Sequence, residues 1–286
     1  MASSNAGYRP PHPLDGRVAL VMSGSRGIGR EVSSQLAALG ARVVVNYASN
    51  SGKAEEHVAE AQSSPRAGTA PVAEPEGGAT ALFRLHEAPP LHRAVAVRAD
   101  VSDPGAVRVL FDRAEAAFGS PPHVVVASVG LLNPKYPALA DTTVEDFDAM
   151  FAANVRGTFL VCREAARRIP PGTGGRIVTF LSSIMATLLP GYTAYTVTNG
   201  AVEATTKILT KEVAAKGLTA NVVAPGPVRT DLFFAGKDEA FVRKVEERSM
   251  GSLAETTDVA SVLTFLVSDG ASWVNGQIIR VNGGFA

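Results

Sequence analysis

Short runs of apolar, largely β-branched residues alternate along this chain with longer segments whose apolar residues recur at helical spacing. The short runs match buried parallel strands, and the longer segments match helices that cover a sheet. Because such alternation implies right-handed crossovers, it predicts an α/β fold with one parallel sheet covered on both faces. The predicted strands span residues 18–22, 43–46, 94–98, 124–127, 176–180, 219–223 and 277–281, and the predicted helices 29–39, 53–62, 104–118, 144–168, 194–216 and 258–267.

Two segments fall outside this alternation. Residues 1–15 are rich in Ser and Pro and lack the apolar stretch of a secretory signal, so we expect a flexible N-terminal tail. Residues 63–93 are rich in Pro, Ala, Gly and Ser without periodicity, which predicts a surface insertion, with a substrate lid as the alternative. Residues 16–286 are then expected to form a single domain that carries this insertion.

Charge and cysteine content exclude several classes of protein. The chain has 27 Lys and Arg against 27 Asp and Glu and no basic stripe, which argues against nucleic-acid binding. No apolar run is long enough to cross a membrane. Cys162 is the only cysteine, which excludes an intrachain disulfide and predicts a reducing, cytoplasmic compartment. The five histidines lack the spacing of metal ligands, so we expect no metal site.

The first predicted strand runs directly into a glycine-rich turn that opens a helix. Glycines let the backbone turn sharply and approach a phosphate, and the helix N-terminus offers free N–H groups and a partial positive charge. This context predicts the dinucleotide-binding turn of a doubly wound Rossmann domain, with an ordinary tight turn as the alternative. The residues assigned to cofactor binding here are Gly24, Ser25, Arg26, Gly27, Ile28 and Gly29.

The residues at the end of the second predicted strand indicate which dinucleotide binds. They are Asn46, Tyr47, Ala48, Ser49 and Asn50. An NAD-binding protein usually has an Asp or Glu there to hold the ribose 2′-hydroxyl, and this segment has no carboxylate that would repel a 2′-phosphate. Arg26 can pair with that phosphate, while Ser49 and Asn50 can add hydrogen bonds. The sequence therefore predicts NADP(H), with a solvated loop arginine as the alternative for Arg26.

Three features together resemble the short-chain dehydrogenase/reductase family. They are the spacing of Gly24, Gly27 and Gly29, the serine pair at the end of the fifth strand, and Tyr195 at the start of a long helix. The resemblance implies a seven-stranded sheet in the order 3-2-1-4-5-6-7 and a homodimer or homotetramer. It also implies that Ser183, with Ser182 as the fallback, orients the carbonyl of a small-molecule substrate, and that Tyr195 donates the proton.

The same resemblance assigns further residues. Asn154 would kink its helix and hold a relay water, or, as the alternative, bond only a neighbouring carbonyl. Asp100 would lie near the adenine, although an acid at a helix N-terminus is an equal interpretation. The other cofactor-binding residues that the resemblance implies are Val101, Gly130, Tyr195, Asn199, Pro225, Gly226, Val228 and Thr230.

The main departure from the family lies four residues after Tyr195, where Asn199 replaces a lysine. An ammonium at that position would lower the pKa of the tyrosine and bind the nicotinamide ribose. Asn199 can bond the ribose but carries no charge, and losing such an interaction costs on the order of 2–4 kcal/mol in the barrier. Ala127 and His123 also depart from the residues usual at the end of the fourth strand.

These features predict an NADPH-dependent oxidoreductase, a carbonyl reductase that reduces an aldehyde or ketone of a small molecule with attenuated activity. Reduction suffers less than oxidation, because Tyr195 begins protonated and needs only to donate. The alternative is an NADP(H)-binding, catalytically impaired homologue that acts as a partner subunit. In the loop 232–251, Phe233, Phe234 and Phe241 either line an apolar substrate pocket or serve packing.

Overall fold

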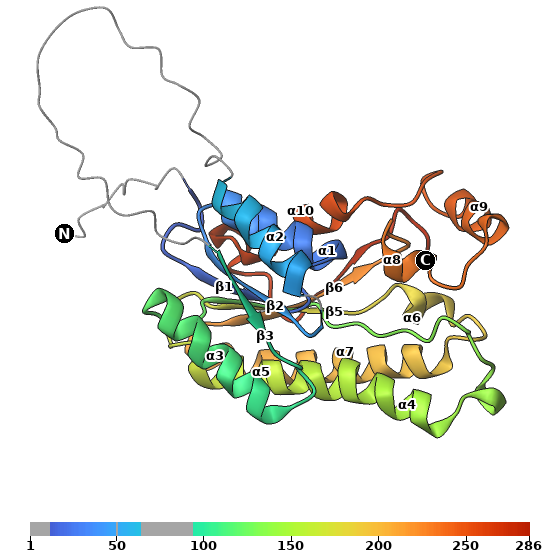
Figure 1. Ribbon diagram of the computed structural model, residues 1–286, viewed down its shortest axis with the longest axis horizontal. Coiled ribbons are helices and arrows are strands. Elements are labelled where there is room, and N and C mark those ends of the chain that lie inside the picture. The colour runs from blue at the N-terminus through green and yellow to red at the C-terminus, as the bar shows by residue number, and fades with distance from the viewer. Residues whose placement is uncertain (1–11, 50, 64–93) are drawn as a thin grey trace, which may run out of the picture.

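The computed structural model describes residues 12–49, 51–63 and 94–286 and contains one parallel seven-stranded sheet (Figure 1). The strand order is β3-β2-β1-β4-β5-β6-β7, as predicted. The chain order reverses between β1 and β4, which is where doubly wound folds bind their ligands. The strands are β1 (Val18–Val21), β2 (Arg42–Tyr47), β3 (Ala94–Arg98), β4 (Val124–Ala127), β5 (Arg176–Phe180), β6 (Thr219–Pro225) and β7 (Ile278–Val281).

Helices cover both faces of the sheet. Figure 1 shows α1, α2 and α10 on one face and α3, α5 and α7 on the other. The α-helices are α1 (Gly27–Ala38), α2 (Ser51–Ser63), α3 (Pro104–Phe118), α4 (Val144–Met150), α5 (Thr158–Arg168), α6 (Ile184–Thr187), α7 (Thr193–Val213), α8 (Asp231–Phe234), α9 (Glu239–Glu247) and α10 (Thr256–Val267). A π-helical segment, η2 (Phe151–Gly157), joins α4 to α5, and 3-10 turns lie at η1 (Leu139–Asp141), η3 (Ala214–Lys216) and η4 (Asp269–Ala271).

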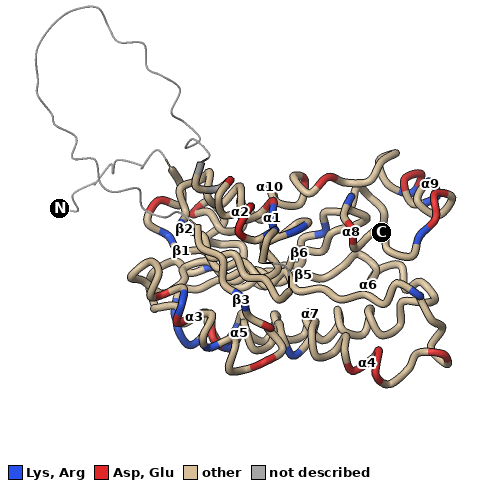
Figure 2. The backbone as a smooth tube through the Cα atoms, viewed as in Figure 1, with Lys and Arg blue, Asp and Glu red and all other residues tan. Residues whose placement is uncertain are grey.

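The central strands are buried on both sides, which explains why they read as unbroken apolar runs rather than as alternating ones. Every residue of β1 and β4 is buried. One hydrophobic core packs α3, α5 and α7 on the sheet, and a second packs α1 and α10 on the opposite face. Charged residues lie mainly on helices and loops, with both signs interspersed (Figure 2).

The predicted N-terminal tail, residues 1–15, extends too far toward the first strand. Residues 12–15 form a turn, in which Leu14 is buried and its N–H donates to the Leu39 carbonyl at 3.0 Å. An apolar contact with the end of α1 therefore orders a stretch that composition assigned to the tail. Ser63 likewise ends α2 instead of opening the insertion. The remaining parts of the predicted tail and insertion, residues 1–11 and 64–93, lie outside the described residues.

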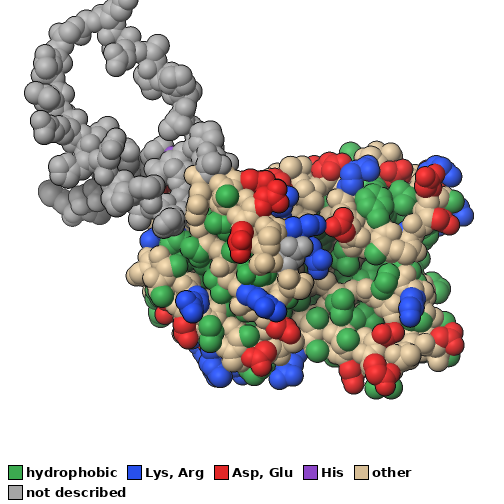
Figure 3. Space-filling view, in the orientation of Figure 1, with side chains coloured by type: hydrophobic (Ala, Val, Ile, Leu, Met, Phe, Trp, Pro, Cys, Tyr) green, Lys and Arg blue, Asp and Glu red, His purple; other side chains and the backbone are tan. Residues whose placement is uncertain are grey.

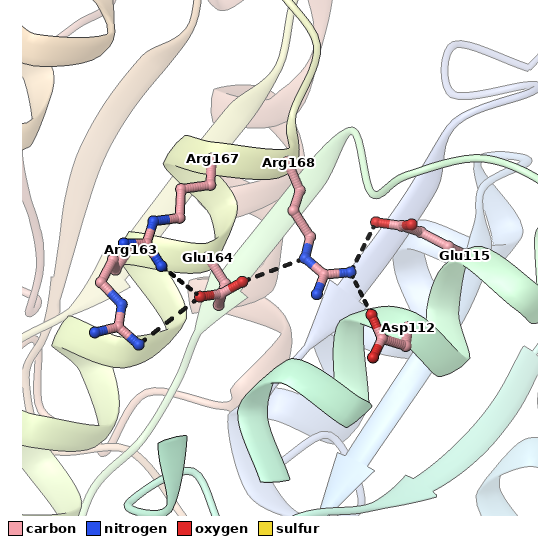
Figure 4. A network of polar contacts seen from close by, with 6 residues as sticks. All are labelled: Asp112, Glu115, Arg163, Glu164, Arg167 and Arg168. Atoms are coloured by element: carbon pink, nitrogen blue, oxygen red, sulfur yellow. Dashed lines mark hydrogen bonds and ion pairs between the residues drawn. The ribbon is translucent and has the colours of Figure 1, made fainter. Parts of the chain in front are cut away.

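A cluster of charges joins α3 to α5 on the outer surface of the helical layer (Figure 4). The Arg168 guanidinium contacts Asp112 at 2.6 Å and Glu115 at 3.2 Å on α3, and Glu164 at 3.3 Å on its own helix. Glu164 is buried and also contacts Arg167 at 3.2 Å. Because Arg168 bridges both helices, it fixes their relative position beneath the sheet.

Within the described residues, no helix is long and apolar enough to cross a membrane, and no group of His, Cys, Asp or Glu side chains could hold a metal ion.

Candidate active site

A cavity of about 450 Å³ opens at the carboxyl ends of the central strands. The loops after β1, β4, β5 and β6 all contribute to its wall, together with the start of α7 and the segment from α8 to α9. Hydrophobic side chains show at the surface over α6, α8 and α9, around this end of the sheet (Figure 3). The predicted site residues that line the cavity are Arg26, Gly27, Ile28, Gly29, Gly130, Asn154, Ser183, Tyr195, Asn199, Pro225, Gly226, Val228 and Thr230.

The glycine-rich turn has the geometry of a phosphate cradle. A side chain at Gly29 would place its Cβ 2.4 Å from the Ser23 carbonyl oxygen, so only glycine allows the turn to close this tightly. Helix α1 begins at Gly27, and the N–H groups of its first turn therefore have no acceptor within the helix. An anion beside these N–H groups would gain both hydrogen bonds and the favourable end of the helix dipole. These residues fit a dinucleotide diphosphate.

Arg26 lies exposed at the mouth of the cavity, at the N-cap of α1. Among the ion pairs of residues 12–49, 51–63 and 94–286 none involves Arg26, so its guanidinium is available to a ligand phosphate. Ser49 and Ala48 are exposed near the end of β2, while the predicted contribution of Asn50 lies outside the described residues.

Asn46 has a different role from the predicted one. Its side chain is buried, and its amide donates to the Val97 carbonyl at 3.3 Å and the Ala99 carbonyl at 3.0 Å. This side chain therefore ties β2 to β3 and does not face a ligand. Sequence reasoning missed Arg98, which pairs with Tyr47 in the sheet and donates through Nε to the Ala48 carbonyl at 3.1 Å. Only the register of β2 against β3 brings this second cation close to the end of β2, where the 2′-phosphate of the cofactor is predicted to bind.

The structure separates two interpretations of the acids after β3. Asp100 accepts from the Ser102 N–H at 2.9 Å and from its hydroxyl at 2.8 Å. The cap of α3 is instead Asp103, which accepts from the Ala106 N–H. Asp100 is exposed and does not cap the helix, so the adenine role remains the prediction for it. Val101 packs against the core under α3 and α5.

The two serines after β5 point in different directions, and this corrects the assignment of Ser183. The Ser183 hydroxyl is buried and donates to the Ala224 carbonyl on β6 at 3.1 Å. The Ser182 side chain instead lies toward the Tyr195 phenol, whose pKa it lowers, and its Oγ accepts from the Ile184 N–H at 3.3 Å. Both serines follow the last residue of β5, and the Ser183 backbone already has the helical conformation that opens α6. The side chain in position to hold a carbonyl beside Tyr195 is that of Ser182.

Tyr195 lies in the first turn of α7, with its phenol on the cavity. Burial raises the pKa of Tyr195, and hydrogen bonds with Ser182 and Asn199 lower it to a smaller extent. The Asn199 amide is buried and donates to the Tyr195 backbone carbonyl at 2.7 Å. The phenol is therefore protonated at neutral pH, which suits a proton donor and disfavours a base.

Asn154 occupies the π-helical segment η2, where the predicted helix 144–168 is interrupted. Its Oδ1 accepts from the Leu131 N–H at 2.7 Å, and its Nδ2 donates to the Leu131 carbonyl at 2.9 Å and to the Thr198 hydroxyl at 3.2 Å. Asn154 thus joins the loop after β4 to α7, directly beside Tyr195. A π-helical segment interrupts the predicted helix at Asn154, and the carbonyl that Asn154 bonds belongs to a loop rather than to the helix. Thr198 was not predicted.

The turn after β6 forms the floor of the cavity. The Thr230 hydroxyl donates to the Val228 carbonyl at 3.2 Å and caps α8 by accepting from the Phe233 N–H at 3.3 Å. After β4, the Ser128 hydroxyl donates to the Met22 carbonyl after β1. A hydroxyl one residue after Ala127 therefore joins the two strand ends, although Ala127 itself has no polar side chain.

The loop after the Thr230 turn contributes one face of the cavity. Phe233 and Phe241 line it, whereas Phe234 is exposed and lies outside the lining. Lys237 also lines the cavity, and nothing in the sequence pattern distinguished it from other surface lysines.

Comparison with known proteins agrees with this architecture. Family models described as "short chain dehydrogenase" and "Enoyl-(Acyl carrier protein) reductase" match residues 17–73 and 71–286. An Arabidopsis thaliana "NADPH-dependent aldehyde reductase-like protein, chloroplastic" is 46% identical over 286 residues, covering 100% of both chains. The Arabidopsis thaliana "NADPH-dependent aldehyde reductase 2, chloroplastic" is 42% identical over 285 residues, covering 99% of each. A Burkholderia cenocepacia short chain dehydrogenase solved with NADP superposes with a TM-score of 0.80 at 30% identity, over 96% of this chain and 99% of that one.

The chain belongs to the short-chain dehydrogenase/reductase family of oxidoreductases. Its candidate active site is the cavity at the carboxyl ends of β1, β4, β5 and β6.

Proposed function

We propose that this protein reduces an aldehyde or ketone of a small molecule with NADPH. The observation that carries the proposal is that one cavity joins the phosphate-cradling turn to Tyr195 and Ser182. Two relatives similar over almost their whole length are named as NADPH-dependent aldehyde reductases or reductase-like proteins, which supports the same cofactor and reaction class.

NADP(H) is the cofactor. The N–H groups at the start of α1 hold the diphosphate, and Arg26 holds the 2′-phosphate, with Arg98 close to the end of β2. Bound NADPH supplies the hydride. Asn199 and the turn at Val228 and Thr230 meet the nicotinamide end, where their polar groups line the cavity. A carboxylate at the end of β2 would repel the 2′-phosphate, and none is present there.

Two side chains of the protein act on the carbonyl oxygen of the substrate. Ser182 donates a hydrogen bond to the substrate carbonyl and fixes its orientation, and the Tyr195 phenol transfers its proton to that oxygen as negative charge develops. Because burial raises the pKa of Tyr195, the phenol stays protonated until negative charge develops on the substrate oxygen. Asn154 holds the loop after β4 and Thr198 in place beside the tyrosine.

The experiment is carbonyl-dependent oxidation of NADPH, followed by absorbance for a panel of aldehydes, ketones and quinones. We expect turnover by the natural chain and its loss in Tyr195→Phe, with NADPH binding by calorimetry unchanged. A second candidate function is an NADP(H)-binding partner subunit with little turnover, and Asn199 in place of a lysine is the observation that favours it. NADPH binding without turnover of any panel member would select this second function.

The outer helices carry exposed apolar residues that suit an assembly of several copies. About half of the surface is exposed at Phe159 on α5 and at Val197 and Ile208 on α7, which fits a homodimer or homotetramer that pairs these helices. Light scattering on the purified chain tests this. For location we propose the cytoplasm, because a single cysteine fits a reducing compartment. Because two relatives are named as chloroplastic, fluorescence microscopy of the full chain with a C-terminal tag is the decisive measurement.

A further inference from the structure

Lys237 is a half-buried cation on the wall of the cavity, between α8 and α9. Its ammonium lies 4.6 Å from the centre of the Tyr136 ring, 4.9 Å from that of Phe233 and 6.0 Å from that of Phe241. It donates to the Phe233 carbonyl at 2.6 Å and to the Tyr136 hydroxyl. Aromatic faces attract a cation but leave its hydrogen-bonding capacity unused.

The surroundings hold this ammonium in a fixed position. Tyr136 has φ of 48°, a left-handed conformation that a bulky residue adopts only when its neighbours impose it. Its hydroxyl donates to the Ala235 carbonyl at 2.7 Å, which ties the loop after β4 to the segment that carries Lys237. A Cβ at Gly236 would lie 1.9 Å from the Pro134 carbonyl oxygen, so the close contact of the two loops requires glycine beside the lysine. The loop that carries Tyr136 and the segment that carries Lys237 are therefore closely packed against each other.

The charge of Lys237 has no partner in the part of the chain that the structure describes. No ion pair of that part includes Lys237, although the cavity lining also contains Asp231. An ammonium has three N–H donors, and the Phe233 carbonyl and the Tyr136 hydroxyl take two. Partial burial of an unpaired cation is unfavourable, and burial lowers the pKa of Lys237 to about 8. An anion from solution would satisfy both the charge and the third donor.

We propose that Lys237 is a specificity-determining residue that binds a carboxylate at the far end of the carbonyl substrate, while Ser182 and Tyr195 hold the carbonyl. The inference rests on the proposed reductase function and narrows its substrate class to oxo acids with an apolar spacer. The Tyr192 ring lines the same cavity and is backed by the Tyr136 ring, with ring centroids 4.9 Å apart and planes tilted by 43°. Tyr195 is three residues after Tyr192 on the chain, so a flat spacer such as an arene would lie against Tyr192.

The test compares 3- and 4-carboxybenzaldehyde with their methyl esters, which keep the ring and the aldehyde but lose the charge; because the ester is the more electron-withdrawing group, a preference for the acid must come from the protein. At pH 7 we expect the natural chain to favour the acid of at least one pair in kcat/KM. Lys237→Met should lower kcat/KM for that acid about 10- to 100-fold, the range for a hydrogen bond to a charged group, and change the ester less than about threefold. Lys237→Arg should restore part of the preference. Lys244→Met, at an exposed lysine of α9 outside the cavity lining, is the matched control and should change neither.

A second measurement does not depend on turnover. Calorimetry of the carboxybenzyl alcohols and their methyl esters on the protein with NADP⁺ should show tighter binding of the acid, lost in Lys237→Met. If neither aldehyde is reduced but this binding pattern is found, the proposed reaction fails and the carboxylate site stands. An equal loss of acid and ester in Lys237→Met, no change in either, or no binding of the acid by the natural chain overturns the inference about Lys237.

Discussion

At the residue scale, the consequence that is easiest to check concerns the serine pair. Ser182 meets the Tyr195 phenol, whereas the Ser183 hydroxyl is committed to the Ala224 carbonyl. We expect Ser182→Ala to lower kcat for carbonyl reduction about 100-fold, because a hydrogen bond to the developing oxyanion is lost. Ser183→Ala should leave kcat within about fivefold and instead lower the free energy of unfolding by about 1 kcal/mol, because a buried carbonyl loses its donor. Steady-state kinetics and urea denaturation of both variants check this, and a larger kinetic effect at Ser183 would contradict the assignment.

Asn199 sets a second expectation at the same scale. Its amide binds the Tyr195 carbonyl and supplies no charge near the phenol, whose pKa burial raises. A lysine there would stabilise the phenolate, so Asn199→Lys should raise the rate of alcohol oxidation by about 10- to 100-fold and shift its pH optimum downward. Reduction should change less, since the protonated phenol is already the donor.

The control for Asn199→Lys is Asn199→Met, because a methionine side chain is similar in length to lysine but carries no charge. It should show neither the gain in oxidation nor the shift in pH optimum. A folded Asn199→Lys variant that binds NADPH without either effect would show that the missing charge does not limit catalysis.

At the scale of elements, the sequence predicted the strands closely and the long helices less well. Continuous valine-rich runs identify buried strands because both faces of the sheet are covered, and β3, β4 and β5 begin and end at the predicted residues. The periodicity of residues 144–168 predicted one helix, yet η2 interrupts it at Asn154. A π turn changes the spacing of apolar residues only locally. The bonds that accompany it, from Asn154 to Leu131 and Thr198, join segments that are far apart in the chain. Hydrophobic periodicity alone does not detect such a turn.

The contact between α3 and α5 yields a prediction on stability. Arg168 joins Asp112 and Glu115 of one helix to Glu164 of the other, and Glu164 is buried. Arg168→Met should lower the free energy of unfolding by about 1–3 kcal/mol, because a buried carboxylate loses a charged donor and the two helices lose their bridge. Arg167→Met is the control, since the Arg167 side chain is 63% exposed, and should cost no more than about 0.5 kcal/mol. Urea denaturation measures both, and equal losses would mean that the bridge to α3 has no special role.

At the scale of the whole molecule, the sequence identified the glycine-rich turn at one end of the cavity more readily than the residues of the opposite wall. The cradle lies within one strand–turn–helix unit, so its residues are neighbours in the chain and form a recognisable spacing. The opposite wall depends on contacts that spacing does not encode, since Lys237 reaches the Tyr136 hydroxyl across 101 residues. Arg98, beside the predicted 2′-phosphate position, escaped prediction for the same reason, because it reaches Ala48 across 50 residues. The choice between Ser182 and Ser183 likewise required the direction in which the end of β5 faces β6.

The assembled cavity should also respond to pH through Lys237. The ammonium binds a substrate carboxylate only while protonated, and burial lowers its pKa to about 8. The neighbouring phenols of Tyr136 and Tyr192 stay protonated in this range, because burial raises the pKa of each above its ordinary value of about 10. Of the nearby acids, Asp231 lies on the cavity wall, and Asp238 accepts from the Phe241 N–H at 2.8 Å as the cap of α9.

Because kcat/KM reports ionisations of the free enzyme, the ratio of kcat/KM for a carboxybenzaldehyde to that for its methyl ester should be constant below about pH 7 and fall as the pH rises through about 8. The ester corrects for any titration of Tyr195, which both substrates share. In Lys237→Arg the ratio should stay level to about pH 9.5, because a guanidinium keeps its proton there. A ratio that does not change with pH in the natural chain, measured alongside an intact acid preference, would show that a group other than Lys237 recognises the carboxylate.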